Sequence, residues 1–453
     1  MIHSDIVSFE MLAAWPVLVI VLMWLDRRHG NAPLFLVYAY IAGLAVNHWF
    51  GGLVHSFPWK PFVDSANTVA GFNETTLGLA CLVAGAAAVP KLKSNSASGR
   101  AMSSSGNRGM SDDIGKRIAT ILLTTGALSW VLEMTPVAQL PSMAAILSGG
   151  KQMLIAGMCM KCWIAWQLKD MSGLYRWVAL SFAFPVYTVV AMGFLGFGMM
   201  FMMTIMIFIG TFYRPRWHVF AGAFVAVFAA LSVYVTYMEH RNNIRSSVWG
   251  GQALEQRLDV FSKMLSEVGP FDFGNPRHLE TIDGRLNQNE LVGKGINYVP
   301  DFRSWANGET IYMALLALVP RAIWPDKPVI AGGMGLVALY TGMEFTVGTS
   351  VGIGQPLEFY VNFGHVGVIA GFLIFGFVLR YIDLRLSMSI QYRMWDDVGM
   401  WFAVGASMLQ PIGQLVEISA AMGAAALVGM LINRYARKLP VEQQVVRGRG
   451  ARR

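Results

Sequence analysis

The sequence predicts an all-α, polytopic membrane protein, and three observations support this fold class. Hydrophobic residues make up 55% of the 453 residues and charged residues only 14%, whereas a soluble domain carries about 25% charge. The mean hydropathy is +0.48. The apolar residues lie in long blocks, such as 179–212, and blocks of this length are typical of helices that cross a bilayer. A soluble enzyme, a fibrous protein and a disordered chain are therefore excluded.

The apolar blocks predict about eleven transmembrane helices. The basic residues support this number, because cytoplasmic connectors of membrane proteins are enriched in Lys and Arg. With the N-terminus outside, 22 basic residues fall in inside connectors and the tail, and only Lys60 and Lys151 fall in short outer loops. One span more or fewer would move half of these charges to the wrong side. The expected spans are 7–25, 34–53, 69–90, 118–137, 150–168, 174–192, 194–212, 217–238, 357–379, 397–412 and 414–434.

The N-terminal segment has no basic stretch before its apolar block, so we expect a retained first span with a periplasmic N-terminus, not a cleaved signal peptide. The predicted organisation has four parts. They are an N-terminal membrane domain of about eight spans (1–238) with a cytoplasmic linker at 91–117, a periplasmic loop subdomain (239–356), a C-terminal membrane domain of about three spans (357–435) and a basic cytoplasmic tail (436–453).

The long loop holds ten Lys and Arg and twelve Asp and Glu, and a connector of this length is usually functional. Its amphipathic stretches, Gly251–Glu267 and Glu309–Val319, predict helices that lie on the membrane surface or dip into it, with Trp305 and Trp324 at the interface. The net charge of +8 comes mostly from the short connectors. Nucleic acid is therefore not an expected partner, and the lipid bilayer is.

The basic residues of the loop are exceptions to the positive-inside rule. They could be paired with neighbouring acids on a solvated face, as in other translocated domains. Alternatively, several of them could bind an anionic, lipid-linked substrate, since guanidinium groups hold phosphate oxygens in a two-pronged geometry. The three prolines of 319–328 favour a rigid turn that presents Arg321 and Lys327. An interfacial turn that only re-enters the bilayer is the alternative.

Glu358, Asn362 and His365 open the next expected span, and their spacing by four and three places them on one face of a continuous helix. Polar groups in a membrane helix usually line a cavity. Glu358 is the candidate general base, and hydrogen bonding between helices is the alternative. Other polar residues within spans, including His48 and Glu74, are expected to be packing pairs. Cys159 and Cys162 are expected in the core, and no pattern indicates a metal or cofactor.

Two segments resemble the Wzy-type O-antigen and exopolysaccharide repeat-unit polymerases. Pro320–Pro328 matches the P-R-x-x-W-P-x-K-P turn of that family, and Glu358–Gly364 matches its E-x-Y-x-N-x-G span start. Arg321 and Gly332 also fit its R-x10-G pattern, which is weak alone because glycine is frequent here. The resemblance covers about 80 residues, 285–364. Members often have arginine motifs in two periplasmic loops, and here only one is present.

The resemblance implies a GT-C-like membrane glycosyltransferase of the bacterial inner membrane that acts without a metal. It would join oligosaccharide repeat units linked to undecaprenyl pyrophosphate, together with a chain-length regulator and a flippase of the same pathway. Arg321 would contact the pyrophosphate, with Glu358 and His365 as the other catalytic residues. The substrate-binding residues would be Lys327 and Asn362, with Arg241, Arg245 and Arg285 as candidates for a second anion site. An O-antigen ligase and a lipid-linked glycan flippase are the rival hypotheses.

Overall fold

The computed structural model describes the chain except for residues 1–5, 30–34, 58–63, 91–107, 134, 140–142, 214–216, 320–322, 329–331, 346–350 and 437–453. The described residues form helices and connecting turns with no strand, so the all-α prediction is confirmed for them. Six helices in this part are long and apolar enough to cross a membrane: Phe9–Asp26, Ser65–Ala87, Met171–Met192, Leu195–Phe212, Gly354–Gln391 and Leu415–Ile432.

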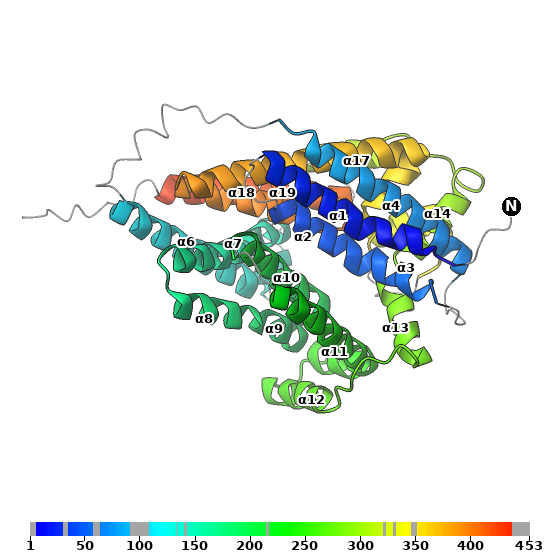
Figure 1. The fold of residues 1–453 in the computed structure, drawn as a ribbon, viewed down its shortest axis with the longest axis horizontal. Helices are drawn as coiled ribbons and strands as arrows, with labels where there is room; N and C mark the ends of the chain where they lie inside the picture. The colour runs from blue at the N-terminus through cyan, green and yellow to red at the C-terminus, as the bar shows by residue number, and fades with distance from the viewer. Residues whose placement is uncertain are drawn as a thin grey trace, which may run out of the picture.

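The longer helices form an elongated bundle (Figure 1). In chain order they are α1 (Phe9–His29), α2 (Phe35–Leu44) continued by the π-helical turn η1 (Ala45–Trp49) and α3 (Phe50–Val54), α4 (Ser65–Ala87), α6 (Arg108–Glu133), α7 (Met143–Gln167), α8 (Met171–Ser181), α9 (Ala183–Met192), α10 (Leu195–Phe212), α11 (Trp217–Trp249), α17 (Gly354–Gln391), α18 (Trp395–Ser407) and α19 (Leu415–Ala436). A short 3-10 helix, η3 (Pro136–Gln139), follows α6.

Five short helices connect α11 to α17: α12 (Leu254–Ser266), α13 (Pro276–Leu286), α14 (Asn289–Tyr298), α15 (Glu309–Ala317) and α16 (Gly333–Thr341). Figure 1 places α13 and α14 at the end of the bundle where α4 begins, and this end is called the loop end below. α12 and α13 lie along one edge of the bundle there, and α17 lies along the opposite edge.

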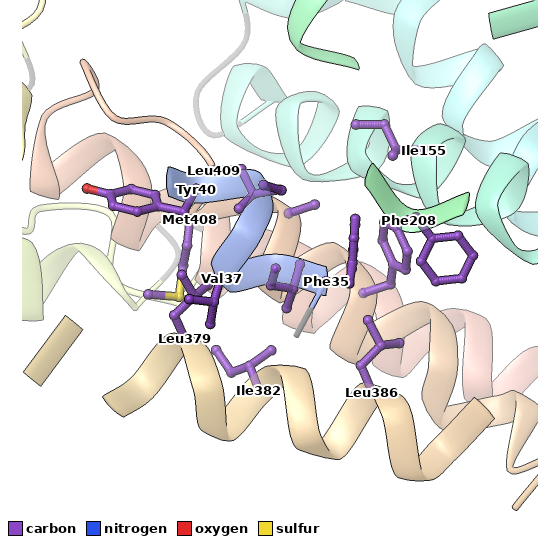
Figure 2. Packing of buried hydrophobic residues seen from close by; sticks show 14 of the residues in the cluster. Phe35, Val37, Tyr40, Ile155, Phe208, Leu379, Ile382, Leu386, Met408 and Leu409 are labelled. Carbon is purple, nitrogen blue, oxygen red and sulfur yellow. The ribbon is translucent and has the colours of Figure 1, made fainter. Parts of the chain in front are cut away.

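Helix α2 lies at the centre of the main core. Phe35, Val37 and Tyr40 of α2 are buried among side chains of α17 and α10, including Leu379 and Phe208 (Figure 2). The Phe35 ring packs edge-on against the Phe208 ring at a centroid distance of 5.1 Å, a favoured aromatic geometry. Because α2 is apolar on all sides, it is surrounded by other helices.

α17 is not one straight helix. Phe363 and Gly364 have non-helical dihedral angles, with φ 63° and ψ −146° at Gly364. The break separates Asn362 from His365. The prediction that Glu358, Asn362 and His365 share one face of a continuous helix is therefore wrong, since Glu358 and Asn362 are fully buried and His365 is exposed.

Two helix boundaries differ from the sequence-based expectation. α11 continues past residue 238 to Trp249, so Arg241 and Arg245 lie on this helix and not in a loop. α6 begins at Arg108, inside the predicted linker 91–117, and residues 91–107 lie outside the described part. In both cases the helix is longer than its apolar block, because polar residues continue α11 at its C-terminal end and begin α6 at its N-terminal end.

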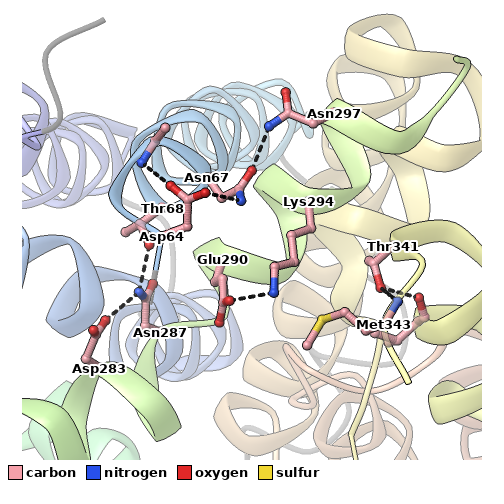
Figure 3. Close-up of polar contacts among 12 residues, drawn as sticks. Asp64, Asn67, Thr68, Asp283, Asn287, Glu290, Lys294, Asn297, Thr341 and Met343 are labelled. Carbon is pink, nitrogen blue, oxygen red and sulfur yellow. Dashed lines mark hydrogen bonds and ion pairs between the residues drawn. The ribbon is translucent and has the colours of Figure 1, made fainter. Parts of the chain in front are cut away.

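Glycines allow α4 and α14 to touch along their backbones. A Cβ on Gly71 of α4 would collide with the carbonyl oxygen of Asn289, and one on Gly293 of α14 would collide with that of Asn67. Further along the same interface, the Asn297 Nδ2 atom donates to the Asn67 Oδ1 atom at 2.6 Å (Figure 3). The loop helices are thus attached directly to a bundle helix.

We expect Gly293→Ala to lower the free energy of unfolding by about 1–3 kcal/mol, because a methyl group cannot fit between the α4 and α14 backbones. Thermal unfolding in detergent would measure the change. Gly335→Ala in α16 is the matched control, since no described atom lies within 4 Å of the position that its Cβ would take. Equal unfolding midpoints for the two variants would contradict the close α4–α14 contact.

Candidate functional site

Three of the sequence-predicted substrate-binding residues meet at the loop end. Arg241 and Arg245 are one turn apart on α11, and Arg285 on α13 lies close enough to both for their charges to repel. Burial first, and then the positive charges of Arg245 and Arg285, lower the pKa of the Arg241 guanidinium. All three stay charged, because an arginine side chain is not deprotonated in proteins. These residues are called the arginine cluster below.

Arg245 is fixed in place by aromatic rings and a backbone carbonyl. Its guanidinium carbon lies 4.4 Å from the Phe194 ring centroid and 5.0 Å from that of Trp249. Its Nε atom donates to the Gly193 carbonyl oxygen at 3.4 Å, and the Tyr237 hydroxyl donates to the same oxygen at 2.7 Å. Cation–π contacts of this kind hold an arginine without neutralising it.

Arg285 is positioned by the packing of α13. Leu279, Ile282 and Leu286 form the buried face of this helix against α3 and α11. Asn275 caps its N-terminus by accepting from the Arg277 amide at 3.0 Å. Arg285 lies outside this buried face and is exposed.

Buried polar contacts anchor α13 to the bundle. Asp283 Oδ1 lies 2.7 Å from His55 Nε2, and both side chains are at most 1% exposed. Asn287 Nδ2 donates to the same Asp283 oxygen at 2.9 Å and to the Thr68 hydroxyl at 2.9 Å (Figure 3). A similar contact joins Asn289 Oδ1 to His48 Nδ1 at 2.8 Å, so His48 has the packing role expected from the sequence.

Within the described residues, no salt bridge to an acid involves Arg241, Arg245 or Arg285. Elsewhere in the loop, Lys294 is paired with Glu290 at 2.7 Å. Like charges held together are destabilising unless a counter-charge binds. The cluster therefore has the chemistry of an anion-binding site, and its guanidinium groups suit phosphate oxygens.

A second polar site lies just after the break in α17. His365 Nδ1 is 2.6 Å from the Glu74 Oε2 atom of α4, and the His365 side chain is 64% exposed whereas that of Glu74 is 5% exposed. The Tyr360 ring packs edge-on against the imidazole. A buried carboxylate thus orients an exposed imidazole, an arrangement suited to proton transfer.

Glu358 and Asn362 lie before the break and hold other elements together. Glu358 Oε2 accepts from the Leu415 amide at 2.7 Å, at the N-terminus of α19, where a carboxylate is favourable. Asn362 Oδ1 accepts from the Gly308 amide at 2.9 Å, and its Nδ2 donates to the Thr310 hydroxyl at 2.8 Å. Both side chains are 0% exposed, so a substrate does not reach them in this conformation.

The remaining predicted site residues belong to the turn at 319–328. Arg321 lies outside the described residues. Lys327 is 7% exposed, and its Nζ atom donates to the carbonyl oxygens of Ala317 and Val319 at 3.2 and 2.7 Å. Lys327 therefore closes the turn in this structure.

The described part of the chain brings together Arg241, Arg245 and Arg285, and separately Glu358 and Asn362. Figure 1 shows α11 and α13 on the edge of the bundle away from α17. Sequence reasoning missed the role of Glu74. Its only signal was a carboxylate within an apolar span, which in a membrane helix requires a partner. No group of three or more His, Cys, Asp or Glu that could hold a metal ion occurs in the described ranges.

A model of the family described as a domain of unknown function, DUF8712, matches residues 111–387. This match covers more than half of the chain, which therefore belongs to that family. The matched region includes the arginine cluster and His365, and Glu74 precedes it. No curated protein and no solved structure matches the chain.

We expect inorganic pyrophosphate to stabilise the purified protein, by about 2.7 kcal/mol at 100 times its Kd, because it would neutralise the arginine cluster. Arg241→Gln with Arg285→Gln should abolish this effect and leave the ligand-free protein no less stable, since repulsion is relieved. Arg277→Gln, on the same helix α13, is the control. Thermal unfolding at constant ionic strength, with and without pyrophosphate, measures the stability of the wild type, the double variant and the control. Equal stabilisation of the double variant would exclude the cluster as the binding site.

Proposed function

We propose that the protein is a membrane glycosyltransferase that polymerises oligosaccharide repeat units linked to undecaprenyl pyrophosphate. The product would be an O-antigen or exopolysaccharide, made on the periplasmic side of the bacterial inner membrane. The proposal combines the resemblance at Pro320–Pro328 and Glu358–Gly364 with the chemistry of the arginine cluster. The family match does not bear on it, because that family has no described function.

The observation that carries the proposal is the arginine cluster without an acidic partner among the described residues. The pyrophosphate of a lipid-linked glycan is a dianion, and guanidinium groups hold phosphate oxygens in a two-pronged geometry. Arg245 is held against two aromatic rings before any ligand arrives. A side chain that is already positioned loses little conformational freedom when an anion binds.

We further propose that the arginine cluster and His365 act at different points in a reaction of two lipid-linked substrates. The donor breaks the bond between its anomeric carbon and its own pyrophosphate, so that pyrophosphate leaves at the reaction centre. The acceptor reacts at its non-reducing end, which lies a whole repeat unit away from its pyrophosphate. We assign the arginine cluster to the acceptor pyrophosphate, and Arg321 and His365 to the reaction centre.

In the proposed step, the acceptor hydroxyl oxygen attacks the anomeric carbon of the donor. The bond from that carbon to the pyrophosphate oxygen breaks, and the pyrophosphate leaves with the electron pair. The hydroxyl proton passes to the exposed nitrogen of His365, while Glu74 holds the opposite nitrogen at 2.6 Å. We favour His365 over Glu358 as the base, because Glu358 is buried at the start of α19.

The proposed orientation places the loop end in the periplasm and the C-terminus in the cytoplasm, with about eleven spans. Six helices fit the length and composition of a membrane span. The other five expected spans coincide with α2–α3, α6, α7, α11 and α18. A GT-C-like architecture, a chain-length regulator and a flippase as pathway partners complete the proposal. A ligase would use the same donor with a different acceptor.

Glycan length in a strain lacking the protein tests this function. We expect single repeat units in the deletion strain and long chains after complementation with the wild type or Arg277→Gln. Arg241→Gln with Arg285→Gln, and separately Arg321→Ala, should give short chains. Full-length chains that accumulate on the lipid carrier would instead indicate a ligase, and repeat units trapped in the inner leaflet would indicate a flippase.

Loss of a general base lowers rates on the order of 10²–10⁴-fold, so we expect His365→Asn to slow polymerisation by that amount. The initial rate with the wild type should fall where the general base is protonated, at acidic pH, and the variant should lose this dependence. Glu74→Gln should be slower than Glu74→Asp, which keeps the carboxylate. Asn73→Ala, an exposed change on α4, is the control. An unchanged pH profile in His365→Asn would rule this residue out as the base.

A further inference from the structure

Helix α15 has two different faces and no charge along its apolar stretch. From Thr310 to Val319 the sequence contains no charged residue. Thr310, Ala314 and Ala317 are buried, and α15 packs on α19 and α17. On the opposite face Tyr312 and Leu315 are 58% and 61% exposed. An uncharged run of this length is too short to span a bilayer but fits a re-entrant segment.

The contact with α19 shows how far α15 extends along the bundle. α19 begins at Leu415, and the carbonyl group of Leu318 packs directly on Gly423. Eight residues of helix correspond to about 12 Å at ~1.5 Å per residue. Gly423 is also close to the middle of the apolar segment Leu415–Ile432. Where α19 crosses a membrane, the end of α15 is therefore near the centre of the bilayer.

The chain then returns to the end from which it came. The Gly332 amide donates to Gln414 Oε1 at 2.9 Å, immediately before the start of α19. Near the turn, the Lys327 ammonium donates to the carbonyl oxygen of Ala317, the last residue of α15, and to that of Val319, two residues further on. In hydrocarbon, free carbonyl groups at a helix end are costly, so this closure suits a turn at membrane depth.

We infer that α15 is the descending leg of a re-entrant hairpin, and that its exposed face, with Tyr312 and Leu315, contacts the acyl chains of the periplasmic leaflet. The inference is independent of the proposed enzyme activity, because it concerns the bilayer and not the substrate. The lipid-facing surface is limited to α15. The return leg carries Asp326 and is not part of it.

Spin-label accessibility in vesicles of phosphatidylcholine and phosphatidylglycerol tests the inference, since these vesicles contain no polyprenyl lipid. The background would be Cys81→Ser, Cys159→Ser and Cys162→Ser. We expect nitroxides at Tyr312→Cys and Leu315→Cys to be relaxed by oxygen and not by a water-soluble nickel complex. Phe302 is 74% exposed and precedes α15. A nitroxide at Phe302→Cys should be relaxed more strongly by the nickel complex than by oxygen.

Nickel accessibility at 312 and 315 equal to that at 302 would overturn the inference, because α15 would then lie in water.

A second pair of variants does not depend on labelling. Leu315→Arg should reduce the yield of folded protein in membranes, since arginine is unfavourable in hydrocarbon, whereas Phe302→Arg should not. Equal yields would also count against a lipid-facing α15.

Discussion

The buried polar contacts between the loop helices and the bundle are the interaction on which the loop end depends. α13 has only 11 residues, and a helix of that length is marginal in water by itself. It is held by its apolar face and by the His55–Asp283 contact, in which both side chains are nearly inaccessible. Removal of one partner from a buried hydrogen bond leaves the other unsatisfied and is destabilising by about 1–3 kcal/mol. The position of Arg285 beside Arg241 therefore follows from a contact on the other side of the same helix.

The sequence was sufficient for the fold class and for the position of most helices, because long apolar blocks leave few alternatives to a helix. It also indicated Arg241, Arg245 and Arg285 as candidates, since basic residues in a long loop that is predicted to lie outside are exceptions to a charge bias. That these three meet could not be predicted. Arg285 is on a separate short helix, and its approach to α11 depends on the packing of Leu279, Ile282 and Leu286.

Two features of the second site were beyond sequence reasoning for different reasons. Glu74 and His365 are 291 residues apart, and a single sequence carries no signal of contacts at that distance. The break in α17 was missed because one glycine within an apolar helical pattern does not by itself predict a break. With the helix taken as continuous, Glu358 and His365 seemed to share a face. The break instead directs Glu358 into the protein and His365 toward its surface.

Gly364 also has a consequence for the interpretation of mutational scans. Its φ of 63° and ψ of −146° lie near a backbone region that is essentially limited to glycine. The Trp305 ring lies against the position that a Cβ would occupy, at 3.2 Å. Every replacement would thus be strained whatever its chemistry, and a scan would score Gly364 as intolerant as a catalytic residue. Intolerance there would report backbone geometry, and only positions on either side would report on the reaction.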